Sequence, residues 1–321
     1  EGTVNIGPYC FFEMNYDSGN RSNFVKINQL SLPSSIESIE TYAFTHTNNG
    51  ALDDLTISFG LLNSIHDYSF VESDVKEVII PASVEYIGAY AFCDSLIQKV
   101  VVSNDSKLEL ISNSAFKNCK NLTVFELGTQ ADNNPGLTFG QYSFMRHVGD
   151  TNEPLDPLLL SFNENTKINA IEKYALCGSL IYQFGPNEKE IILPSTLSTI
   201  GDGAFIGILS NRATVAEVIG EKINGIGSNT HIKKIIFRSN DQLSAIPFSC
   251  FAGIGVTGPA KSQGTLLQLD LSELTNLTSI GDYAFQYAGM DIGGEIKLPK
   301  DVRTIGRGCF YEFVFTGDFT I

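Results

Sequence analysis

Several features that whole classes of protein require are missing from this sequence. The 321 residues include no Trp, only three Met and 18% charged residues, and the formal net charge is −15. The 21 Lys and Arg residues form no stripe, so a phosphate backbone would be repelled, and we expect no nucleic acid partner. No apolar run approaches the roughly 18 residues that a spanning helix needs, so we expect no membrane span in this chain.

Motifs for catalysis and for metal or cofactor binding are also missing. The sequence has no C-x-x-C, H-E-x-x-H or G-x-S-x-G, and its four His share no metal-ligand spacing. The G-x-G-x-x-G at residues 253–258 runs into Pro259 and does not open a helix after a strand, as a phosphate cradle requires. We therefore expect no catalytic residue, cofactor or metal site, and a protein that is not an enzyme. An active site assembled from distant residues would leave no motif.

What the chain does contain is a repeated motif. A six-residue stretch that begins with Ile and most often ends with Ala-Phe, such as Ile87–Phe92, recurs from end to end. We call it the closing motif. Its copies end at Phe11, Phe44, Phe70, Phe92, Phe116, Phe144, Leu176, Phe205, Phe251, Phe285 and Phe310. The shortest interval, from Phe70 to Phe92, is 22 residues, which sets the size of the minimum unit.

A second constant element lies between consecutive closing motifs. It has the form L-x-x-I-x-I and often runs into Pro, as in Val75–Pro81 and Ile296–Pro299. Alternation with period two places the two outer apolar residues inward and the middle one outward, so we expect a strand there. After it the chain turns into the closing motif, for which we expect about one helical turn.

One such unit cannot bury its inward Ile, Val, Ala and Phe alone, whereas stacked neighbours bury them in one continuous core. We therefore predict a single solenoid of about eleven units over residues 1–321. Longer loop insertions are expected near residues 145–157, 206–231 and 252–265, where the units are longest.

The residues also resemble a known family. The pattern L-x-x-I-x-I-P-x-S-V-x-x-I-G-x-x-A-F, filled by Val75 to Phe92 and by Gly293 to Phe310, is similar to that of the BspA-like leucine-rich repeat family of cell-surface proteins. The resemblance covers nearly the whole chain. It implies an α/β solenoid, a right-handed leucine-rich repeat superhelix with a parallel β-sheet on its concave face and short helical turns opposite. It also implies an exported, surface-displayed protein that acts as an adhesin or ligand-binding module.

The six Cys occupy positions that favour free, buried thiols. Cys10, Cys250 and Cys309 precede the last residue of a closing motif, where other copies carry Ala or Ser. Cys250 and Cys309 belong to units two apart, beyond the roughly 7 Å between Cα atoms that a disulfide spans. A single bridge between Cys93 and Cys119 is the main alternative.

Solenoids bind along their extended strand face, so the outward middle residue of each strand is a candidate contact. The candidate ligand face consists of Thr56, Ile79, Val101, Glu126, Ile192, Ile236, Asp270 and Lys297, and Ser31, Ser161 and Thr320 take the same place in other units. The neighbouring aliphatic residues Ile79 and Val101 would form an apolar patch suited to a protein partner. The alternative is that β-branched residues simply suit strands.

These features predict a non-catalytic, secreted or cell-surface module that binds an extracellular or host protein through its strand-lined face. A structural spacer that displays another domain is the alternative, because the chain starts within a unit at Val4 and stops in an expected strand at Ile321. Carbohydrate binding is weaker, since the recurrent Phe rings are expected to point inward. A targeting segment before Glu1 was either removed or never existed.

Overall fold

The computed structural model describes residues 4–13, 35–47, 62–146, 156–207, 232–254, 256–257 and 263–313. The chain divides into two compact units, Glu1–Phe144 (unit 1) and Met145–Ile321 (unit 2), and each is described by itself. Most of the predicted insertions at 145–157 and 206–231 and part of that at 252–265 lie outside the described residues. The single solenoid over the whole chain therefore stays a prediction.

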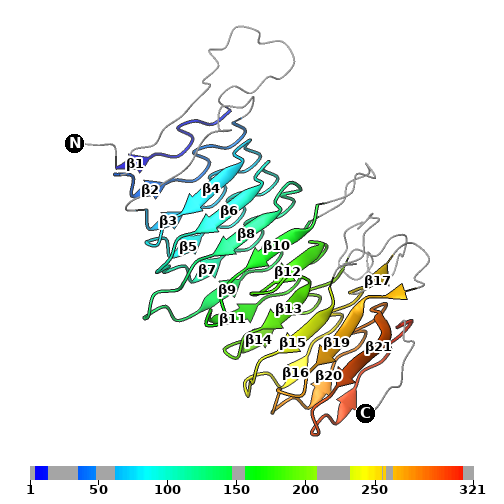
Figure 1. Cartoon of the computed structure of the whole chain (residues 1–321). Coiled ribbons are helices and arrows are strands. Elements are labelled where there is room, and N and C mark those ends of the chain that lie inside the picture. The colour runs from blue at the N-terminus through cyan, green and yellow to red at the C-terminus, as the bar shows by residue number, and fades with distance from the viewer. Residues whose placement is uncertain are drawn as a thin grey trace. The chain divides into compact units, whose positions relative to one another are not determined.

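Unit 1 consists of two parallel sheets, whose strands alternate along the chain from β3 onward (Figure 1). Short strands form the first sheet, the short-strand sheet, in the order β1 (Asn5–Ile6), β2 (Ser38–Ile39), β3 (Ser64–Ile65), β5 (Tyr86–Ile87), β7 (Leu110–Ile111) and β9 (Leu137–Phe139). Longer strands form the second, the long-strand sheet, from β4 (Glu77–Ile80), β6 (Lys99–Val102) and β8 (Val124–Leu127). One strand of each kind and the closing motif make up one repeat, which we call a coil.

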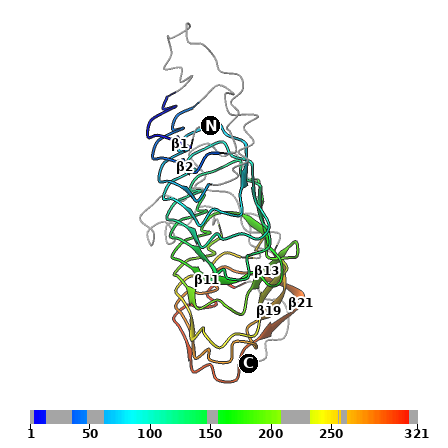
Figure 2. The same ribbon diagram turned by 90° about the vertical axis from the view of Figure 1, so that its left-hand side faces the viewer.

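Unit 2 repeats this arrangement. Its long-strand sheet contains β10 (Leu158–Ser161), β12 (Ile181–Phe184), β13 (Glu190–Leu193), β15 (Lys234–Phe237), β19 (Leu266–Asp270) and β21 (Met290–Lys297). Its short strands are β11 (Ile168–Ile171), β14 (Thr199–Ile200), β16 (Ala245–Ile246), β20 (Ser279–Ile280) and β22 (Thr304–Ile305). Strands β17 (Val256–Thr257) and β18 (Gln263–Gly264) form an antiparallel pair. Figure 2 shows β11 on one side of the coils and β13 and β19 on the other.

The expectation of helical turns, and with it the α in the predicted α/β class, is wrong. Within the described residues the closing motifs are turns, and none forms a helix. The amides of Tyr68 and Phe70 donate to the carbonyl oxygens of Ala89 and Ala91 in the next coil, at 3.0 and 2.7 Å, whereas the Ser69 amide donates three residues back within its own turn. An α-helix directs its amides four residues back along the same chain, so alternate donation to a neighbouring coil excludes it.

Left-handed backbone angles produce this alternation. In the turn that closes at Phe70, Tyr68 has a φ of 59° and Glu72 a φ of 52°, and the same pair of positions recurs in other coils. Further pairs are Tyr9 and Glu13, Tyr42 and His46, Tyr90 and Asp94, Ser114 and Asn118, and Tyr283 and Tyr287. This region costs an L-residue roughly 1–2 kcal/mol, so the hydrogen bonds between coils must compensate.

The core of each unit contains a column of stacked Phe rings. In unit 1, Phe44, Phe70, Phe92 and Phe116 are almost completely buried, and consecutive ring centroids lie 4.9 to 5.1 Å apart. In unit 2, the rings of Phe205, Phe251 and Phe285 stack at 5.2 and 5.5 Å. The predicted inward position of these closing residues is confirmed, while Phe11 and Phe310, in the first and last described coils, are only half-buried.

All six cysteines are free, as predicted. Cys93 does not bridge to Cys119, whose thiol donates to the Phe92 carbonyl oxygen at 2.9 Å. Five of the six are buried, but Cys10 is exposed, so its predicted burial is wrong. Cys10 belongs to the first coil of the described residues, and no described coil lies before it.

Candidate functional site

The long-strand sheet of unit 1 presents the predicted candidate residues on its outer face. Ile79 lies directly opposite Val101, and Val101 lies opposite Glu126 on the next strand. Ile79 is 38% exposed, Val101 is half-buried and Glu126 is exposed, while Val78 and Val100 are buried in the core. The predicted outward orientation of these three residues is confirmed.

Charged side chains surround this pair of aliphatic residues. Glu77 and Lys99 occupy the adjacent outward row, opposite each other on β4 and β6. Among the described residues, neither they nor Glu126 forms an ion pair. We call the five residues Ile79, Val101, Glu77, Lys99 and Glu126 the unit 1 patch. Its charges are therefore available to a partner.

In unit 2 the corresponding row runs through Ile192, Ile236, Asp270 and Lys297 on four consecutive paired strands. The last three are half-buried. Ile192 is only 6% exposed, so its predicted outward exposure is wrong. Gly185, just after β12, approaches so closely that a Cβ on it would lie 3.2 Å from the Ile192 Cβ. Gly185 follows β12, a strand that the sequence patterns did not predict, and the segment after β12 covers Ile192.

The charges on the unit 2 face are paired with one another. Lys234 lies 2.8 Å from Glu190, and Lys297 lies 3.6 Å from Asp270 and 3.2 Å from Glu295. Partial burial acts to raise the pKa of Asp270, but hydrogen bonds from Ser272 and the Lys297 charge outweigh it and hold that pKa below its ordinary value. A partner would have to break existing pairs here.

Three other predicted positions, Thr56, Ser31 and Thr320, lie outside the described residues. Ser161 ends β10 and is half-buried. The structure thus brings the candidates together as two groups, one on each unit.

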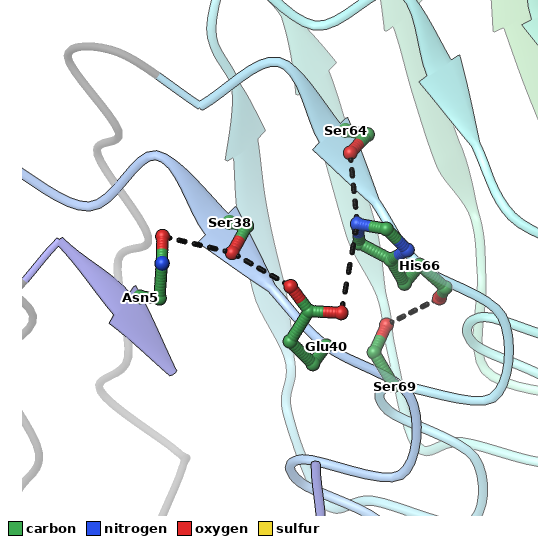
Figure 3. A network of polar contacts seen from close by, with 6 residues as sticks. All are labelled: Asn5, Ser38, Glu40, Ser64, His66 and Ser69. Carbon is green, nitrogen blue, oxygen red and sulfur yellow. Dashed lines mark hydrogen bonds and ion pairs between the residues drawn. The ribbon is translucent and has the colours of Figure 1, made fainter. Parts of the chain in front are cut away.

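The short-strand sheet of unit 1 carries a polar network that the sequence analysis missed (Figure 3). The Ser38 hydroxyl lies 3.1 Å from Asn5 Oδ1 and 3.0 Å from Glu40 Oε1. Nε2 of His66 lies 3.2 Å from the Ser64 hydroxyl and 3.9 Å from Glu40 Oε2. These residues flank Ile6, Ile39 and Ile65, the first residues of three closing motifs, and that position is the only sequence signal for the network.

The network does not have the geometry of a catalytic triad. In a triad one imidazole nitrogen contacts the nucleophile and the other contacts the orienting carboxylate. Here Ser64 and Glu40 both approach the same nitrogen of His66. In the described part of the chain no group of three or more His, Cys, Asp or Glu could hold a metal ion, and no helix there is long and apolar enough to cross a membrane.

Comparisons with known proteins place these features in context. No curated protein matches the chain significantly. A leucine-rich repeat protein from Bacteroides ovatus is 17% identical, with 97% of this chain and 80% of that chain covered and a TM-score of 0.41. The pneumococcal vaccine antigen PcpA is 18% identical, with 95% and 71% covered and a TM-score of 0.36. A leucine-rich repeat protein from Eubacterium ventriosum is 18% identical, with 99% and 82% covered and a TM-score of 0.34.

The repeat itself matches a family model. Six copies of the BspA type leucine-rich repeat region match residues 5–147, 177–255 and 261–320. These ranges contain the described strands of unit 1 and most of those of unit 2, while β10, β11, β17 and the closing motif that ends at Leu176 lie between the matched ranges. The chain therefore belongs to the family of BspA type leucine-rich repeat proteins.

Proposed function

We propose that this chain is a non-catalytic surface module that binds an extracellular protein through the unit 1 patch. The observation that carries the proposal is the pair of aliphatic residues Ile79 and Val101, which lie side by side and outward on parallel strands. Exposed apolar residues that lie together within a polar rim are typical of protein-binding surfaces.

The charges of the patch favour unit 1 over unit 2 as the contact. Glu77, Lys99 and Glu126 form no ion pair within the described residues, so a partner can pair with them without breaking an existing contact. On unit 2 the corresponding charges already pair with one another, as Lys234 does with Glu190 at 2.8 Å. A partner would have to break such a pair and remove its charges from water, and the free energy that this costs offsets the free energy gained from the new contacts.

A binding role without catalysis is supported by the chemistry of the outward rows. The rows hold aliphatic and charged side chains, and in the polar network Ser64 and Glu40 both approach the same imidazole nitrogen of His66. The family resemblance supports a location outside the cell, at its surface. It also supports right-handed winding of the coils with the long-strand sheet on the concave side.

Surface plasmon resonance with a panel of immobilised extracellular-matrix glycoproteins tests the proposal at physiological salt. We expect saturable binding to at least one of them. The double variant Ile79→Ser, Val101→Thr should weaken that binding at least about tenfold, because central apolar contacts dominate interface energies. Both residues are outward, so the thermal midpoint should change little.

The matched control is Ile236→Thr, which changes a half-buried aliphatic residue on the same face of unit 2. Binding should stay within about twofold of the unchanged protein. Equal losses in the control and the double variant would overturn the assignment to unit 1. Absence of saturable binding across the panel would overturn protein binding and favour the spacer role.

A further inference from the structure

The outer face of the short-strand sheet of unit 1 changes character along its length. On β2 and β3 one row of the sheet holds the hydrogen-bonded serines Ser38, which is half-buried, and Ser64, which is buried. On the next two strands the same row holds Tyr86 and Leu110, which lie opposite each other. The Tyr86 ring contacts His66 edge-on, with ring centroids 6.0 Å apart. The polar network therefore gives way to an apolar surface.

This apolar surface is open. Leu110 is 37% exposed and Tyr86 is half-buried, whereas their neighbours Ile87 and Ile111 are fully buried. Leu110 is one of the few large apolar side chains on the described surface with this much exposure. A Leu at this level of exposure beside a Tyr is a contact for an apolar side chain of a partner.

Two carboxylates directly precede the apolar pair in the chain, one on each coil. Glu85 and Glu109 precede Tyr86 and Leu110, and the Glu109 amide donates to the Glu85 carbonyl oxygen at 2.8 Å, so the two residues are adjacent on neighbouring coils. Both are exposed, and neither forms an ion pair among the described residues. Lys107, two residues before Glu109, is also exposed and forms no ion pair with Glu109.

Charge complementarity defines the partner. Two like charges on adjacent coils repel one another, so a cation placed near both is attracted to both. An arginine side chain can pair with a carboxylate through two hydrogen bonds and can stack its plane on a tyrosine ring. The spacing of neighbouring strands, about 4.8 Å, brings successive contacts within the reach of one short segment.

We propose that Tyr86, Leu110, Glu85 and Glu109 form a second docking surface, which binds a basic, Arg-containing segment of a partner protein. An apolar side chain of that segment contacts Leu110, and its arginines pair with the two carboxylates. This surface is on the short-strand sheet and is independent of the proposed function of the unit 1 patch on the long-strand sheet.

Fluorescence anisotropy of a labelled ten-residue peptide, with Arg at alternate positions and one central Leu, tests this surface. We expect saturable binding by the full chain and at least a tenfold weaker affinity for Glu85→Gln, Glu109→Gln. Leu110→Ser should also weaken binding severalfold, because the contact is not electrostatic alone. A peptide with Glu in place of each Arg should not bind.

The matched control is Asp105→Asn, Asp132→Asn, which removes the same charge from exposed residues of the same unit that belong to neither proposed surface. It should leave peptide affinity within twofold. A loss equal to that of the Glu85 and Glu109 variant would show attraction to net charge only and would overturn the site. Absence of saturable binding would overturn it as well, and neither result bears on Ile79 and Val101.

Discussion

The ring of Tyr174 lies against the backbone of Gly203 in the next coil of unit 2. A Cβ at residue 203 would be 2.3 Å from Cε1 of that ring, and Gly203 has a φ of 61°. Gly308 stands in the same relation to the ring of Tyr283, at 2.5 Å. In unit 1 the tyrosines at this position stack on one another, with Tyr68 and Tyr90 centroids 5.0 Å apart. A Gly in the next coil thus leaves room for the preceding ring to lie against its backbone.

Gly203→Ala is predicted to destabilise unit 2 by about 2 kcal/mol or more, because it combines a left-handed backbone with overlap against the Tyr174 ring. Chemical denaturation followed by far-ultraviolet circular dichroism measures the change. Gly7→Ala is the matched control, since a Cβ there meets no atom within 4 Å. A similar loss in both variants would contradict this explanation.

Phe92→Ala is predicted to cost about 3–5 kcal/mol of stability. The ring is fully buried between those of Phe70 and Phe116, at 5.0 and 5.1 Å, so its removal leaves a cavity that two neighbours line. Hydrogen exchange should show lost protection in the adjacent coils. Ile79→Ala, which removes an outward side chain, should have little effect on the thermal midpoint. A negligible shift for Phe92→Ala would show that the ring is not in the core.

The thiols are predicted to differ sharply in reactivity. Burial raises the pKa of Cys309 to about 12 and that of Cys93 further still, so both remain protonated at pH 8. Cys10 is exposed. Brief treatment of the native protein with iodoacetamide at pH 8 should therefore modify Cys10 first, as peptide mass spectrometry would show. Rapid labelling of all six in the native protein would contradict the buried positions.

The same pKa shifts predict a loss of stability at alkaline pH. The unfolded thiols lose protons near pH 9, whereas Cys309 in the folded chain keeps its proton up to about pH 12. Between these values the folded state binds more protons, so the free energy of unfolding falls as pH rises. Replacing Cys309 with Ala should reduce the slope of stability against pH between 9 and 11.

The sequence predicted features that depend on the burial pattern within one coil. The inward positions of Ile87 and Phe92 and the outward position of Ile79 follow from apolar spacing alone. Each side chain can face either the core or the solvent, and the spacing of the apolar residues decides between the two. Apolar spacing repeated in every unit also predicted parallel strands that pair with their counterparts in the next coil, as Val78 does with Val100.

What the sequence did not predict depends on contacts between coils. The left-handed φ of Tyr90 is stabilised by the hydrogen bond that its amide donates to the Asn113 carbonyl oxygen in the next coil. The spacing within one closing motif carries no sign of that contact and fits a helical turn equally well. Strand β12 lacks the L-x-x-I-x-I pattern, and without it the covering of Ile192 could not be foreseen. The contact of Glu40 with His66 likewise joins two coils.

In-register stacking of the coils is the central claim, and a disulfide formed between neighbouring coils tests it most directly. In a Cys10→Ser background, Ile79→Cys with Val101→Cys places two thiols opposite each other on adjacent strands, about 4.8 Å apart at Cα, within the range that a disulfide spans. Oxidation should give a bridged product about 2 Da lighter than the reduced protein, because a disulfide forms with the loss of two hydrogen atoms. The pair Ile79→Cys with Glu126→Cys, about twice as far apart, should remain reduced. Bridging of the second pair as readily as the first would contradict the stacked arrangement.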